Sequence, residues 1–241
     1  MAIKILLLQA RKQEDTAKDE ERASFAEATA VPIENIVPFD LLAAAPTLSK
    51  IQQFDALMIG GSGDYYVSKK DFPHLPRLLE VLQKVVAAGQ PTFASCFGFQ
   101  LLVQALGGNI IYDPEHIEVG TFPVTLTDSG QTDELFAHMP TQFRAQIGRK
   151  DRADRLPDGF LHLASSANAP FQALRVPDKP IWATQFHPEL TKAENLKRFK
   201  RYMDGYASMM SPDEVQETLK RFDESPEANG LLRQFMTLVF G

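Results

Sequence analysis

Cysteine is almost absent from this chain, since Cys96 is the only one in 241 residues. A single cysteine cannot close an internal disulfide, so nothing points to an oxidising compartment and a cytoplasmic location is expected. Long hydrophobic runs are also lacking: the apolar stretch within residues 1–9 is far shorter than the ~18 to 20 residues of a membrane span. No cleavage site of the signal type follows it, and we therefore expect no membrane association.

Positive charge is scarce as well. Lys and Arg number 25 against 31 Asp and Glu, which gives a formal net charge of −6 at pH 7. The basic residues are spread along the chain and form no patch that could neutralise a row of phosphates, so nucleic acid is not expected as a ligand. The hydrophobic content of 44% is ordinary for a globular protein, and the length suits one substantial domain.

Short apolar runs alternate with helical patterns over most of the chain, which predicts an α/β fold with a doubly wound, largely parallel sheet. Residues 109–175 break this pattern with short alternating pieces, and we expect a small β-rich edge there. The charged stretch 11–22 is expected to be solvated. Two helices should follow residue 211, where Ser-Pro-Asp-Glu is a helix start signal. We expect one domain over residues 1–205 and a C-terminal helical extension, residues 206–241, packed on it.

The only cysteine stands where a predicted strand meets a predicted helix. Residues 92–95 are expected to form a strand, the thiol of Cys96 follows at once, and Gly98 opens an apolar helix. A sharp strand-to-helix turn of this kind presents a nucleophile at the top of a sheet. The positive end of the helix stabilises a thiolate, which is the attacking species. Taken alone, a cysteine in an apolar segment is more often a small buried side chain than a nucleophile.

A histidine and a carboxylate follow a later strand, in the run Gln-Phe-His187-Pro-Glu189. A strand projects residues two apart onto one face, so the two side chains can meet. Together with Cys96 they predict a catalytic triad in which Cys96 is the nucleophile, His187 the general acid and base, and Glu189 the residue that orients the imidazole.

A third feature is the glycine-rich end of the predicted strand within residues 54–63. Gly60 permits close approach of the backbone to a substrate, and the N–H groups of Gly61 and Phe97 are the natural donors for an oxyanion hole. Each feature has a structural explanation by itself, because many strands end in glycine and many histidines are structural. Their joint occurrence favours the catalytic interpretation.

These segments resemble the class I, triad-type glutamine amidotransferases, and most of all the glutaminase portion of GMP synthase. The similarity covers residues 3–203 and is most specific in residues 95–100 and 185–189. It implies a flavodoxin-like three-layer sandwich in which Cys96 attacks the side-chain amide of glutamine, forms a γ-glutamyl thioester and releases ammonia and glutamate. The resemblance also implies that Gln100 helps to seat the substrate and that no metal or organic cofactor is needed.

One segment departs from the family. Gly148-Arg149-Lys150-Asp151 stands where many relatives carry a His-containing stretch that shapes the substrate pocket. Arg149 is therefore a candidate clamp for a substrate carboxylate, with an exposed basic loop as the alternative. A γ-glutamyl peptidase would use the same triad, and a non-catalytic binding or regulatory protein on the same fold is a third hypothesis. The chain lacks a P-loop pattern, so a separate synthetase subunit is a possible acceptor of the ammonia.

Overall fold

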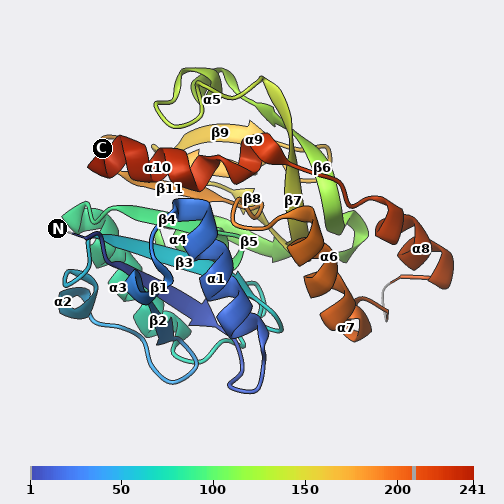
Figure 1. Cartoon of the computed structure of the whole chain (residues 1–241), viewed down its shortest axis with the longest axis horizontal. Coiled ribbons are helices and arrows are strands. Elements are labelled where there is room, and N and C mark those ends of the chain that lie inside the picture. Colours follow the sequence, from blue (N-terminus) through green and yellow to red (C-terminus); the bar gives the residue numbers. More distant parts are fainter. Residues whose placement is uncertain (1, 208–209) are drawn as a thin grey trace.

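The computed structural model describes residues 2–207 and 210–241 of the chain. In this part of the chain a nine-stranded sheet runs through the molecule in the order β2-β1-β3-β4-β11-β10-β9-β6-β7, and β5 pairs with β8 in a second, two-stranded sheet (Figure 1). The strands are β1 (Ile5–Ala10), β2 (Ile36–Asp40), β3 (Ala56–Ser62), β4 (Thr92–Ser95), β5 (Asn109–Tyr112), β6 (Glu118–Leu126), β7 (Gln142–Arg149), β8 (Asp151–Arg155), β9 (Leu161–Ser165), β10 (Ala173–Arg175) and β11 (Ile181–Thr184).

The central sheet has a parallel and an antiparallel half. Strands β2, β1, β3, β4 and β11 are all parallel to their neighbours within this group. They are largely buried between the helical layers, which explains why β1 and β3 are continuous apolar runs. The predicted β-rich edge lies in β5 to β10, and four of these strands extend the same sheet by antiparallel pairing. The doubly wound α/β prediction is therefore confirmed, with a larger antiparallel part than expected.

Helices cover both faces of the parallel half and give the fold three layers (Figure 1). One face packs on α3 and α4, and the other packs on α1 and α10. In the described part of the chain, no helix has the length and hydropathy needed to cross a membrane. The helices are α1 (Ala17–Thr29), α2 (Leu48–Ile51), α3 (Leu75–Ala88), α4 (Phe97–Ala105), α5 (Asp128–Thr132), α6 (Lys192–Arg201), α7 (Met203–Ala207), α8 (Pro212–Lys220), α9 (Pro226–Asn229) and α10 (Leu231–Phe240), with short 3₁₀ turns at Ile33–Asn35 and Pro114–His116.

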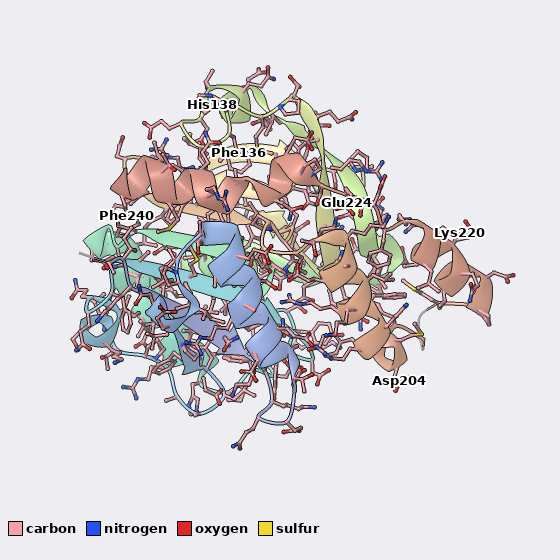
Figure 2. All side chains as sticks on the ribbon, in the orientation of Figure 1. Phe136, His138, Asp204, Lys220, Glu224 and Phe240 are labelled. Atoms are coloured by element: carbon pink, nitrogen blue, oxygen red, sulfur yellow. The ribbon has the colours of Figure 1, made fainter. Side chains whose placement is uncertain are left out.

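The C-terminal residues form two parts, an arm and a helix, α10, that covers one face of the sheet. The arm is α6 to α8; Figure 2 shows Asp204 on α7 and Lys220 on α8 along its outer side. Helix α8 begins as predicted, because the Ser211 side chain accepts a hydrogen bond from the Glu214 N–H and Glu214 reciprocates in a capping box. Helix α10 returns to the sheet, where Phe235 packs edge-on against Phe93 and Trp182. Residues after 211 form three helices where two were expected.

The charged stretch 11–22 differs from the expectation that it is solvated. Arg11 is 2% exposed and Glu21 is fully buried. Helix α1 starts only at Ala17, and the face that carries Glu21 and Phe25 lies against the sheet. The prediction was wrong at these two positions because the opposite charges neutralise each other inside the protein, with Arg11 Nη2 2.8 Å from Glu21 Oε1.

Candidate active site

Cys96 occupies the turn between β4 and α4. Its backbone has φ 52° and ψ −101°, a conformation that residues with a side chain rarely adopt. The turn is fixed on one side by the Cys96 N–H, which donates to the Thr184 carbonyl oxygen on β11 at 2.8 Å. Backbone strain of this kind is concentrated at functional sites, and here it aims the thiol out of the carboxyl end of the sheet.

Glycine at position 98 allows α4 to start immediately after the cysteine. A Cβ atom on Gly98 would lie 2.6 Å from the carbonyl oxygen of Ile59, so a larger residue would push α4 away from β3. Phe97 is the first residue of α4, and the first N–H groups of a helix have no acceptor within it. The thiol therefore stands at the positive end of a helix, beside a backbone donor.

His187 lies between Cys96 and Glu189. Its Nδ1 is 2.7 Å from Glu189 Oε1, and both side chains are at least 93% buried. Burial lowers the pKa of His187, but the charges and hydrogen bonds of Glu189 and Cys96 outweigh it and raise that pKa to about 9. The ring is thus in contact with a thiol on one side and a carboxylate on the other, which is the arrangement that the sequence predicted for acid–base work.

Glu189 is held in turn by a row of buried charges that comes from distant parts of the chain. Burial raises the pKa of Glu189, but His187 and then Arg198 lower it below its usual range. The guanidinium of Arg198, on α6, lies 3.7 Å from Glu189 Oε1 and 3.8 Å from Glu21 Oε1. Glu21 is paired with Arg11. Charges of alternating sign therefore extend from Arg11, which directly follows β1, to the imidazole of His187. Each carboxylate in this row lies next to an arginine.

Glu21 also contacts the glycine-rich end of β3. The Gly61 N–H donates to Glu21 Oε1 at 3.2 Å. A Cβ on Gly60 would lie 2.7 Å from Glu21 Cδ, and one on Gly61 would lie 3.0 Å from His187 Cε1. Both glycines therefore allow close packing, Gly60 against the carboxylate of Glu21 and Gly61 against the imidazole of His187. In this structure the Gly61 N–H faces Glu21, whereas the N–H of Phe97, the other predicted oxyanion donor, has no acceptor in its own helix.

The two predicted substrate contacts lie in different surroundings. Gln100 lines the cavity at Cys96, and its Nε2 donates to the Asp151 carbonyl oxygen and to Gln185 Oε1, both at 3.2 Å. The Arg149 side chain is completely buried, and its Nη2 lies 2.7 Å from Glu118 Oε2. This ion pair gives the Arg149 guanidinium a structural role. Arg149 also lines the cavity at Cys96, and its buried Nη1 has no hydrogen-bond partner, so the carboxylate clamp stays a prediction. The exposed loop that was its alternative is not found, because Arg149 is buried on β7.

Two small cavities meet at the candidate triad. The first, of about 50 Å³, is lined by Cys96 and Gln100 and also by Tyr66, Lys150 and Tyr206. The second, of about 40 Å³, is lined by His187 and by aromatic residues of the C-terminal arm, namely Phe199, Tyr202 and Tyr206. Tyr206 is common to the two linings. In the described residues no group of three or more His, Cys, Asp or Glu is arranged to hold a metal ion.

The sequence profile described as "Glutamine amidotransferase class-I" matches residues 34–201, which is more than half of the chain. The chain belongs to this family. The resemblance inferred from the motifs is thereby confirmed, and family membership supports glutamine hydrolysis in general terms.

Curated relatives of this amidotransferase include larger proteins and a separate subunit. A glutamine-hydrolyzing GMP synthase of Thermosipho africanus is 33% identical over 136 residues, 56% of this chain and 24% of the relative. One subunit of the glutamine-hydrolyzing GMP synthase of Methanocaldococcus jannaschii is 29% identical over 122 residues, which is 51% of this chain and 63% of that relative. The match thus spans about a quarter of the length of the first of these relatives.

Solved structures share the fold. A glutamine amidotransferase from Thermotoga maritima aligns over 100% of both chains with a TM-score of 0.70 and 19% identity. A glutamine amido transferase from Methylobacillus flagellatus covers 99% of this chain, and the chain covers 93% of it, with a TM-score of 0.73 and 19% identity. At these identities the similarity establishes the architecture of the amidotransferase and not its substrate.

Several residues around Cys96, His187 and Glu189 were not predicted from the sequence. Arg11 and Glu21 lie in a segment whose charge suggested solvent. Arg198 follows the histidine motif by 11 positions, on a helix whose other charges are largely exposed, so no local pattern marks it. Tyr206 belongs to residues that were expected to be an extension, and only the path of the arm beside the site brings its ring to the cavities.

Proposed function

We propose that this protein hydrolyses the side-chain amide of glutamine through a γ-glutamyl thioester on Cys96. The observation that carries the proposal is the buried imidazole of His187, placed between the thiol of Cys96 and the carboxylate of Glu189 with a pKa raised to about 9. A raised pKa makes the imidazole a stronger proton acceptor, so His187 is suited to take the proton of the Cys96 thiol as the nucleophile attacks.

The reaction follows from these positions. The Cys96 thiolate attacks the amide carbon, and the Phe97 N–H is placed to stabilise the oxyanion that forms. His187 gives its proton to the amide nitrogen, the carbon–nitrogen bond breaks and ammonia leaves. The thioester remains on Cys96. His187, now neutral, removes a proton from water, the resulting hydroxide attacks the thioester carbon, and glutamate leaves as the thiol is restored.

The cavity at His187 is the space that the leaving group enters, because the leaving group must face the residue that protonates it. Its volume of about 40 Å³ holds about three water molecules, so ammonia fits there. The cavity is open to solvent on one side, so a larger leaving group can extend out of it. The γ-glutamyl peptidase therefore stays the alternative, and the substrate comparison below distinguishes the two.

The destination of the ammonia is part of the proposal. The relatives that the chain resembles are glutamine-hydrolysing GMP synthases, and the chain matches only a portion of them. We propose that a separate partner of the synthetase type accepts the ammonia when it is bound, and that the ammonia escapes to water otherwise.

The test is release of glutamate by the purified protein from glutamine and from γ-glutamyl dipeptides, measured side by side with Cys96→Ala. We expect turnover of glutamine that falls at least about 10⁴-fold in the variant. Equal activity of the two proteins would overturn the proposal, and a preference for dipeptides would replace it with the peptidase. If the isolated wild type is silent on every substrate, alkylation of Cys96 by a glutamine-like electrophile decides, because a competent triad reacts at a rate that the substitution His187→Ala reduces.

A further inference from the structure

We propose that Lys150, supported by Lys69, binds the α-carboxylate of the γ-glutamyl substrate. This inference rests on the proposed function and adds to it the group that selects the amino-acid end of the substrate. It starts from the position of Lys150, a half-buried residue that lines the same small cavity as Cys96.

The ammonium of Lys150 is placed for binding but is not neutralised. Its Nζ donates to the carbonyl oxygen of Gly205 at 2.7 Å and lies 4.2 Å from the centre of the Tyr206 ring. An ammonium has three donors, so this single hydrogen bond leaves capacity for an anion. Burial, and then the nearby charge of Lys69, lower the pKa of Lys150 to about 8, and a bound carboxylate would offset both effects.

Lys69 adds a second positive charge beside the cavity. Its Nζ lies 3.9 Å from the ring centre of Tyr66, which lines the cavity, while Lys150 lies 5.8 Å from the same ring. The lysine–carboxylate ion pairs among the described residues use other lysines and leave these two without such a partner; they involve Lys12, Lys18, Lys197 and Lys220.

Two carboxylates lie near these lysines. Asp64 pairs with Lys12 at 2.8 Å. Asp151 lines the same cavity as Lys150 and accepts hydrogen bonds from the hydroxyl and the N–H of Ser68, at 2.6 and 3.0 Å. Its single negative charge stands against the two positive charges of Lys150 in the lining and Lys69 beside it, so the local balance favours an anion in a chain of net charge −6.

The two cavities decide which end of the substrate meets the lysines. The leaving nitrogen must point to His187, whose cavity Lys150 does not line. The acyl half then occupies the cavity at Cys96, and its α-carboxylate lies at the end remote from the reacting carbon. Arg149 and Lys150 both line this space. The charge of Arg149 is balanced by Glu118, whereas Lys150 has no carboxylate partner, so we assign the carboxylate of the acyl half to Lys150.

Binding to the inactive Cys96→Ala protein tests the inference without turnover. We would measure by calorimetry the affinity for glutamine and for glutamine α-amide, which lacks the α-carboxylate, and compare γ-glutamylglycine with γ-glutamylglycinamide. The same background would carry Lys150→Met, Lys150→Arg or Lys69→Met, with Lys70→Met as the matched control. Lys70 is the exposed neighbour of Lys69 and does not line the cavity.

We expect Lys150→Met to weaken glutamine about 10- to 100-fold and to leave the already weak α-amide unchanged. Lys69→Met should have a smaller effect in the same direction, Lys150→Arg should restore most of the affinity, and Lys70→Met should change nothing. Equal losses for glutamine and its α-amide would show that Lys150 acts by holding Gly205, and would overturn the inference. The inference would also be overturned if Lys150→Met weakened γ-glutamylglycine only through the carboxylate of its glycine. Absence of binding by every γ-glutamyl compound would overturn it as well. Failure of wild-type turnover with these binding results intact would reject the reaction and not the carboxylate site.

Discussion

Cys96 and His187 approach each other from two regions that are held in place by different means. Cys96 is positioned by backbone geometry: a strained turn, the glycine two residues later and the first turn of α4. His187 is positioned by charge, through Glu189 and then Arg198 and Glu21, which come from α6 and α1. The first region consists of consecutive residues, whereas the second is assembled from segments more than 150 positions apart.

The difference follows from the roles that we propose for the two residues, Cys96 as nucleophile and His187 as general acid and base. A nucleophile has to stay at one point, and a rigid turn at a helix end provides that. A general acid and base has to change charge during the reaction, so its surroundings must stabilise both states. Buried charges that compensate one another do this, because no single ion has to be stabilised alone in the interior. The predictions below test this division of roles, in order of decreasing effect.

Glu189→Gln should have the largest effect. The amide keeps an oxygen for His187 Nδ1 but removes the charge that orients and stabilises the imidazolium, and we expect kcat for glutamine to fall about 10³-fold. The measurement is steady-state glutamate release, or Cys96 alkylation if the protein needs a partner. An activity within a factor of about ten of the wild type would contradict this division, because the charge of Glu189 would then not be what positions His187.

The pH dependence of the unfolding free energy should reveal the interaction between His187 and Glu189. The folded pKa of His187, about 9, lies above the unfolded value near 6.5. The stability it contributes, about 3 kcal/mol, is therefore fully present below pH 6.5 and is lost as the pH rises through 9. Urea unfolding at pH 6.5 and pH 9 should show this loss in the wild type and a flatter profile in Glu189→Gln. The difference between the two proteins removes the contribution of other titrating groups, and identical slopes would contradict the coupling.

Gly98→Ala tests whether backbone packing positions the turn at Cys96. The added methyl would clash with the Ile59 carbonyl oxygen, and we expect a loss of about 2 kcal/mol in unfolding free energy. Gly230→Ala is the matched control, because its nearest atom would be 3.5 Å away and its backbone is already right-handed helical. The control should be neutral or slightly stabilising. Equal effects of the two substitutions would show that close packing at Gly98 does not position the turn.

The same division explains what could be predicted from the sequence. The parallel strands, helix α3 and the turn at Cys96 are encoded by neighbouring residues, through apolar runs and a glycine at a fixed spacing, and the fold prediction was confirmed. The buried pairing of Arg11 with Glu21 depends on where α1 packs on the sheet, and charged residues are usually solvated. The ion pair of Arg149 was missed for the same reason: its partner Glu118 lies on another strand, and no local pattern in the sequence connects the two residues.

Arg198→Met should have the smallest effect and is the sharpest test of the charged half. Arg198 makes no hydrogen bond through its Nη atoms, Glu21 keeps Arg11 as a partner, and Glu189 keeps His187, so the fold should tolerate the change. The positive charge of Arg198 offsets that of Glu189 and opposes protonation of the ring. Its loss should therefore raise the pKa of His187 by about half a unit to one unit.

The pKa shift should move the acid limb of the pH–rate profile to higher pH, since the neutral imidazole is needed to activate water. The matched control is Arg201→Met on the same helix, because Arg201 pairs with Glu20 at 2.7 Å and not with the buried row. NMR titration of the His187 ring in the two variants compares them directly. A downward shift in Arg198→Met, or the same shift in both variants, would mean that Arg198 only fills space behind Glu189. An upward shift confined to Arg198→Met would show that α6, which is remote in sequence from the nucleophile, adjusts the proton affinity of the group that activates it.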